Sequence, residues 1–130
     1  MIQPMEGFRL SKAKIFREEM KEAGTTYSVI LLEMKNAYIF LLSEGEERLG
    51  TLAVSLPPKP GMIGPPLSST LLGERNAALS RMLAERLAKR LGRIVLISIF
   101  AKTMKERQVP RIFLNLLNRI LEKAETENEP

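Results

Sequence analysis

The sequence predicts a single α+β domain in which an antiparallel β-sheet carries helices on one face. The chain has 130 residues, enough for one hydrophobic core of ordinary size, and 45% of them are hydrophobic while 27% are charged. Short runs rich in β-branched and aromatic residues, separated by turn residues, dominate the first half. Two amphipathic helical patterns follow in the second half. These observations together define the fold class.

A short helical segment is expected near the start of the chain. Residues 12–21 are mostly charged, and they place Ile15, Phe16 and Met20 at helical spacing. Gly24 and the threonines that follow it then end the segment.

Three strands are expected next. Residues 27–34 and 37–42 are apolar and too short for typical helices, and Lys35-Asn36 between them suits a tight hairpin turn. Residues 49–56 form a third strand. We expect the three to make an antiparallel meander.

A proline-rich segment then interrupts the regular structure. Residues 57–66 hold five of the eight prolines, and proline fixes φ and lacks an N–H group. We therefore expect a long loop, with Met62 and Ile63 exposed on it. A merely flexible loop is favoured over a functional one, and both remain open.

A helix and a strand follow this loop. Residues 74–91 form an amphipathic helix that Gly92 ends, and residues 94–100 form a strand with apolar residues on both sides. The apolar stripe of the helix is Leu79, Met82, Leu83, Leu87 and Leu91.

A second amphipathic helix closes the pattern. Pro110 suits its first turn, and the polar tail is expected to fray over residues 125–130. Its stripe is Ile112, Phe113, Leu116, Leu117, Ile120 and Leu121. The domain spans 1–130, with the core over about 7–124.

The strands 28–34, 37–42 and 94–100 are apolar at consecutive positions, whereas a sheet with one wet face should alternate. Two helices cover only one face of such a sheet. The other face needs a cover, and a second copy of the same sheet is the simplest one. We therefore expect two subunits with stacked sheets, either a homodimer or a pair with a related subunit.

The residues that are missing exclude most catalytic chemistry. The chain has no Cys, His, Asp or Trp, so it lacks thiolate nucleophiles, Ser-His-Asp triads and the usual zinc and magnesium ligands. Ser11 and Lys14 match an S-x-x-K pattern, but a chain without Asp cannot supply the S-D-N element that this chemistry needs. We expect no enzyme activity, no cofactor and no metal.

The net charge of +5 allows contact with acidic partners without requiring nucleic acid. Basic residues gather on the helix 74–91. The favoured interpretation is a solvated face, followed by a surface for an acidic protein partner and then by one for nucleic acid. The basic positions at its C-terminal end are Arg86, Lys89 and Arg90. No segment reaches the ~18 to 20 apolar residues of a transmembrane helix, so we expect a cytoplasmic protein.

One sequence element is specific enough to suggest a family. The run Ser68-Ser69-Thr70-Leu71-Leu72-Gly73-Glu74 resembles the signature of the proteasome assembly chaperone 4 family, whose sibling is chaperone 3. The similarity continues through the helix 83–90 and the strand 94–98 to residues 116–120 of the last helix. Upstream, residues 27–42 look like the central hairpin of that family, so the resemblance covers roughly 27–124.

The resemblance implies a non-catalytic chaperone that holds proteasome α-subunits while their ring forms. It also implies a small subunit whose antiparallel sheet stacks on that of a partner. In the signature, Leu71 and Leu72 would anchor the strand-to-helix junction, and Gly73 would allow a turn that a side chain obstructs.

We expect α-subunits to contact loop residues and basic helix positions, namely Met62, Ile63, Arg86, Lys89 and Arg90. A general interaction or scaffold module with a dimeric β-sandwich is the alternative function, and a basic nucleic-acid-binding domain is the third.

Overall fold

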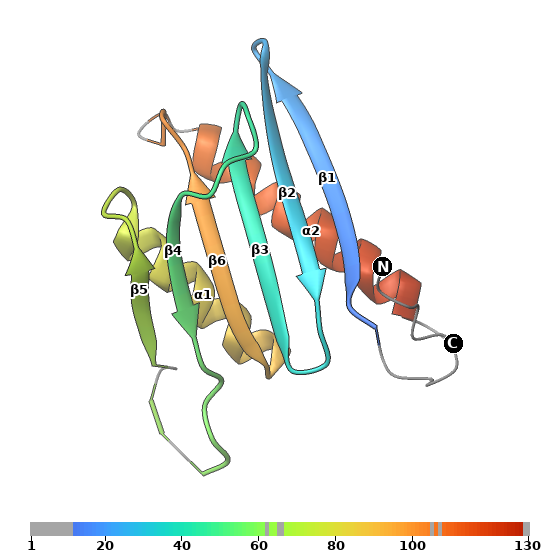
Figure 1. The fold of residues 1–130 in the computed structure, drawn as a ribbon, viewed down its shortest axis with the longest axis vertical. Helices are drawn as coiled ribbons and strands as arrows, with labels where there is room; N and C mark the ends of the chain where they lie inside the picture. Colours follow the sequence, from blue (N-terminus) through green and yellow to red (C-terminus); the bar gives the residue numbers. More distant parts are fainter. Residues whose placement is uncertain (1–11, 62, 65–66, 105, 107, 129–130) are drawn as a thin grey trace, which may run out of the picture.

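Six strands form one sheet, and two helices lie on the same face of it (Figure 1). The computed structural model describes residues 12–61, 63–64, 67–104, 106 and 108–128. The elements in chain order are β1 (Lys14–Glu22), β2 (Thr25–Glu33), β3 (Ala37–Glu44), β4 (Thr51–Ser55), β5 (Ser68–Leu72), α1 (Ala77–Leu91), β6 (Ile94–Phe100) and α2 (Gln108–Asn128). The predicted α+β class, with helices on one face, is confirmed.

The strand order is β1-β2-β3-β6-β4-β5. β3 and β6 run parallel, and the other neighbouring pairs are antiparallel. The predicted meander is right for the hairpin of β2 and β3 but wrong for the third strand, because β6 lies between β3 and β4. β6 reads IVLISIF, and a strand this apolar is more stable between two neighbouring strands than at an edge of the sheet.

The prediction of a helix over residues 12–21 is wrong, because this segment is strand β1. It pairs with β2 over nine residues, from Lys14 opposite Glu33 to Glu22 opposite Thr25. The turn between the strands has positive φ at Ala23 (50°) and Gly24 (82°), which matches the twist of a tight hairpin. Long-range pairing therefore outweighs the helix propensity of the charged residues.

The core lies between the sheet and the two helices. α1 packs on β4, β5 and β6, and α2 packs on β1 and β2. All six residues of the predicted α2 stripe are buried. In α1 the prediction holds for Leu83 and Leu87, which are buried, and it is wrong for Met82, which is 47% exposed.

α1 differs from the prediction at its start. α1 starts at Ala77 rather than at residue 74, because Asn76 has φ 61°, which a right-handed helix does not accommodate. It ends as predicted at Gly92, whose N–H donates to the carbonyl of Ala88. α2 continues to Asn128, and the fraying expected over residues 125–130 stays a prediction.

The proline-rich segment connects β4 to β5. Its described residues, 57–61 and 63–64, belong to no helix or strand, as predicted. Met62, Pro65 and Pro66 lie outside the described residues, as do residues 1–11.

Candidate protein-interaction surfaces

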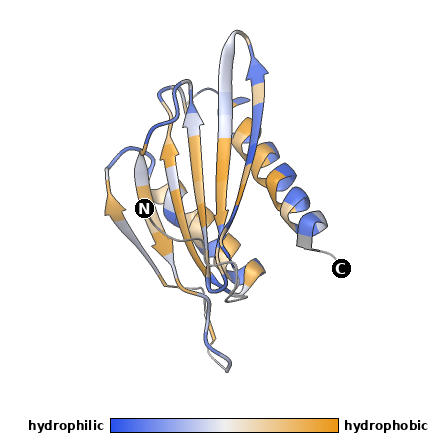
Figure 2. Cartoon of the chain, turned by 45° about the vertical axis from the view of Figure 1, so that its right-hand side comes forward, coloured by the Kyte–Doolittle hydropathy of each residue, from blue (hydrophilic) through white to orange (hydrophobic). Residues whose placement is uncertain are grey.

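The sheet face opposite the helices is apolar, and we call it the open face. Its side chains alternate along each strand with the buried core residues, and they pair across strands, as Ile30 does with Leu41 and Leu32 with Ile39. Figure 2 shows hydrophobic residues following one another along the central strands. The open-face residues, all half-buried in the single chain, are Ile30, Leu32, Ile39, Leu41, Leu52, Val54, Leu96 and Phe100. An apolar surface of this extent marks an interaction site.

A charged loop borders this face. In the β3–β4 connection, the backbone N–H of Arg48 donates to Ser43 Oγ at 3.2 Å, and its guanidinium lies 5.7 Å from the centroid of the Phe100 ring. Arg17 donates through Nε to Glu47 at 2.9 Å. Hydrogen bonds to Glu47 and Glu19 raise the pKa of Arg17, so this guanidinium stays charged. The open face therefore has an apolar centre and a charged rim, as reversible interfaces do.

A second apolar surface lies between the two helices, and we call it the helix groove. Met82 of α1 and Leu114 of α2 are 47% and 45% exposed along it. Two connected hollows of about 190 and 60 Å³ form the groove, and Leu83, Arg86 and Leu114 line both of them. Arg90 also lines the larger hollow. The helix groove thus combines exposed apolar side chains with two cations.

The structure brings together some of the predicted contact residues and separates others. Arg86 and Arg90 share the helix groove. Lys89 is exposed but follows Glu85 by four residues, and Glu85 bonds to Ser68 of β5, so Lys89 belongs to the opposite flank of α1. Ile63 is fully exposed on the β4–β5 loop. Met62 lies outside the described residues.

The signature run 68–74 forms the edge strand β5 and its turn into α1. Ser68 donates to Glu85 Oε2 at 2.5 Å, which ties this edge to α1. Leu71 and Leu72 are each 51% exposed, so in the single chain they do not anchor the junction as the resemblance implies. Leu72 pairs instead with Leu52 of the open face. The remaining members are half-buried (Thr70) or exposed (Ser69, Glu74).

Gly73 has the backbone role that the sequence predicts. Its φ is 84°, and a Cβ placed there would lie 2.7 Å from Thr51 Oγ1 and 3.0 Å from Thr51 Cα. Both the backbone conformation and the space exclude a side chain without local movement.

Sequence reasoning missed Met82 and Leu114 as surface residues. Met82 fits the apolar stripe of α1 and so looks like a core position, whereas Leu114 falls outside the predicted stripe of α2. Their exposure follows from how far apart the sheet holds the two helices, and no local pattern encodes that distance.

Within the described ranges, no group of three or more carboxylate, imidazole or thiol side chains is arranged to hold a metal ion. Among the described helices, none has the length and apolarity that crossing a membrane requires.

An α+β subunit whose sheet has one uncovered apolar face belongs to the class of protein-interaction subunits. The family model for proteasome assembly chaperone 4 matches residues 26–99, more than half of the chain. The chain belongs to this family, and its role is therefore that of an assembly chaperone.

Solved structures show the same fold. The chain is similar to a subunit in the crystal structure of a novel chaperone complex for yeast 20S proteasome assembly, with a TM-score of 0.61 and 18% sequence identity. The match covers 90% of this chain and 98% of the other. No curated protein sequence matches the chain.

Proposed function

We propose that this protein assists proteasome assembly by binding α-subunits while their ring forms, without catalysing a reaction, in the cytoplasm. The observation that carries the proposal is the open face, considered together with membership of the family. An apolar surface that an isolated chain leaves half-exposed is suited to binding another protein. The work of such a chaperone is done by two contacts, one with its own partner subunit and one with the client.

The partner that we propose for the open face is a second copy of this chain. Six strands about 4.8 Å apart and about seven residues long make a sheet of roughly 29 by 23 Å, or about 670 Å² before corrugation. This is close to the ~800 Å² per partner of a standard stable interface. The face is uncharged at its centre, and Arg17 and Glu19, which β1 places at its edge, pair with each other, so two copies can stack without burying unpaired charge.

Light scattering tests the dimer. The wild-type chain should have twice the mass of 14.7 kDa at micromolar concentration. Leu41→Glu on the open face should give a monomer, because a carboxylate would be buried in the stacked pair. Leu114→Glu, the same change in the helix groove, should remain a dimer. A wild-type monomer, or dissociation by both variants, would contradict the stacking.

The contact that we propose for α-subunits is the helix groove, with Met82 and Leu114 as apolar anchors and Arg86 and Arg90 beside them. Apolar anchors next to charges are the usual composition of a reversible interface. The groove lies on the helix face, so it stays accessible when the open face is covered. Met62, Ile63 and Lys89 remain predicted contact positions that are tested separately from the groove.

Co-elution with purified α-subunits from the same organism tests this contact. Arg86→Glu/Arg90→Glu should weaken binding, more at low salt than at high salt, because exposed charges are screened within about 10 Å at 0.1 M. Lys21→Glu/Lys102→Glu makes the same charge change at exposed positions outside the groove and should bind normally. Met62→Ala/Ile63→Ala tests the loop.

Failure of the wild-type chain to co-elute with any α-subunit would refute the assignment of the client. If neither the arginine variant nor the loop variant changes binding, α-subunits remain the client, but these residues do not form the contact surface. A salt-dependent shift of RNA or DNA, without α-subunit binding, would favour the nucleic-acid alternative.

A further inference from the structure

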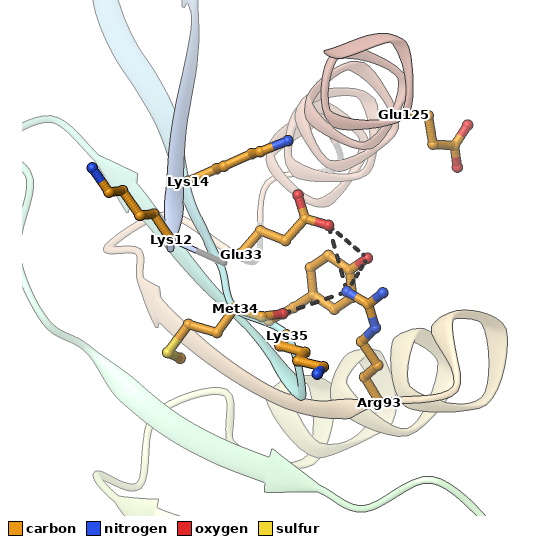
Figure 3. Close-up of a pocket in the computed structure, with 8 residues that line it drawn as sticks. Lys12, Lys14, Glu33, Met34, Lys35, Arg93 and Glu125 are labelled. Carbon is orange, nitrogen blue, oxygen red and sulfur yellow. Dashed lines mark hydrogen bonds and ion pairs between the residues drawn. The ribbon is translucent and has the colours of Figure 1, made fainter. Parts of the chain in front are cut away.

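A basic hollow lies on the helix side of the sheet, at the end where the β2–β3 turn meets the start of β6. Its volume is about 460 Å³. Four of its lining residues are cations, while two are carboxylates, Glu33 and Glu125. Figure 3 shows that the cations come from separate segments: two precede or begin β1, one is in the turn and one precedes β6. They are Lys12, Lys14, Lys35 and Arg93.

Arg93 is held in place by contacts on one edge and one face of its guanidinium. Nη1 donates to Tyr38 Oη at 3.1 Å and to the Met34 carbonyl at 3.4 Å, and it lies 3.5 Å from Glu33 Oε2. The guanidinium carbon lies 5.1 Å from the centroid of the Tyr38 ring. Tyr38 in turn donates to Glu33 at 3.1 Å. Among the described residues, the hydrogen bonds found for Arg93 all run through Nη1.

This arrangement leaves the Nε and Nη2 edge of Arg93 pre-positioned. Two N–H groups on one edge of a guanidinium match the two oxygens of a carboxylate, and such bidentate pairs are among the strongest protein hydrogen bonds. Because the tyrosine stack and the Nη1 bonds already restrict the side chain, a ligand loses little of its binding energy to ordering it. The Arg93 side chain is 38% exposed, so a ligand can reach it from solvent.

We propose that this hollow binds an acidic segment of a partner protein through its side-chain carboxylates. Arg93 takes one carboxylate, and the exposed Lys12 and Lys35 provide positive charge for the neighbouring ones. Glu33 already serves as the internal counter-ion of Arg93, so the net charge of the lining remains positive. This inference stands whether or not the α-subunit proposal holds.

A protein segment fits better than a nucleic acid. Tyr38 is the aromatic side chain of the hollow, and it is 9% exposed and covered by Arg93, so it offers no surface on which a base could stack. The hollow also lies on the helix side, so it stays open when the open face is covered.

Fluorescence anisotropy with a labelled, C-terminally amidated hexaglutamate peptide tests the proposal. The wild-type chain should bind it at low salt and release it as the salt concentration rises. Lys12→Glu/Lys35→Glu should weaken binding by about tenfold or more. Lys21→Glu/Lys102→Glu carries the same change of net charge to exposed positions outside the hollow and should match the wild type.

Two further arms identify the group that is recognised. Arg93→Lys keeps the charge but loses the two N–H groups on one edge of the guanidinium, so it should weaken binding by about tenfold. A melting curve of this variant shows whether the chain remains folded. An amidated hexaglutamine peptide should not bind, and the same peptide with a free C-terminal carboxylate should bind no better.

Four results would overturn the proposal. The first is that the wild-type chain does not bind hexaglutamate, and the second is that the two double-lysine variants weaken binding equally. The third is that the glutamine peptide with a free C-terminus binds as well as hexaglutamate. The fourth is that a short single-stranded oligonucleotide binds more tightly than hexaglutamate. The third would assign the hollow to chain termini, and the fourth would assign it to nucleic acid.

Discussion

A methyl group at Gly73 would disturb the connection from β5 to α1 in two ways. The φ of 84° lies in the left-handed region, which costs about 1–2 kcal/mol for a residue that carries a Cβ. The added Cβ would also lie 2.7 Å from Thr51 Oγ1. Thr51 is buried, and its hydroxyl donates to the carbonyl of Arg75 just before α1. Moving Thr51 would cost that hydrogen bond, about 0.5–1.5 kcal/mol.

Gly73→Ala should therefore lower the free energy of unfolding by about 1.5–3.5 kcal/mol. Gly24→Ala is a matched control, because Gly24 has φ 82° and nothing within 4 Å of its added Cβ. It should lose only the backbone cost, about 1–2 kcal/mol.

Thermal unfolding at fixed protein concentration measures the difference between these variants. One kcal/mol corresponds to about 4 °C for a chain of this size, so the melting temperature should fall by about 6–14 °C for Gly73→Ala and about 4–8 °C for Gly24→Ala. Equal losses would show that Thr51 moves without cost, and an unchanged Gly73→Ala would refute the backbone role. Gly73→Val should lose still more, because a β-branched residue is stiffer.

Three other measurements test single groups. Burial, followed by nearby glutamates, raises the pKa of both tyrosines, Tyr27 and Tyr38, above the ordinary 10.0. Tyrosinate absorbance should therefore appear with a midpoint above pH 10. The free energy of unfolding should decline above pH 10, because the folded chain then binds more protons than the unfolded one. A tyrosinate midpoint at or below pH 10 would contradict the raised pKa. Ser28 has a buried hydroxyl for which the described residues offer no hydrogen-bond partner. Ser28→Ala should therefore leave the free energy of unfolding in urea unchanged or raise it by up to about 1 kcal/mol. A clear loss would reveal a partner. Ser68→Ala should lower the free energy of unfolding by about 0.5–1.5 kcal/mol, because it removes the hydrogen bond to Glu85. A double-mutant cycle with Glu85→Gln should show coupling between the two residues. Additive losses would mean that this hydrogen bond contributes nothing to stability.

The local patterns in this sequence predict single helices and strands well, but they predict poorly which of them lie side by side. The strand 94–100 was predictable to the residue, because six of its seven residues are apolar and β-branched residues predominate between Gly92 and Lys102. The α2 stripe was predictable because six residues repeat at helical spacing. β1 was not, since KIFREEMKE fits both a helix and a strand, and its pairing with β2 decides between them.

The interaction surfaces depend even more on long-range order. The consecutive apolar residues of β2 and β3 already predicted a second apolar face, because alternate residues of a strand point to opposite sides. Arg86 and Arg90 were predictable as neighbours from their spacing of four on one helix. The cluster of Arg93 with Tyr38 and Glu33 was not, because 55 and 60 residues of sequence separate its members.

The central position of β6 determines the order in which the chain can complete its fold during synthesis. β1, β2 and β3 can pair with one another as soon as they leave the ribosome, and β4 can pair with β5. These two groups share no strand contact in the sheet until Ile94–Phe100 emerges and bonds to both. Until then β3 and β4 each present an unpaired apolar edge, which is the feature that leads nascent chains to aggregate. A protein that helps others to assemble would therefore itself need protection until its last quarter is made.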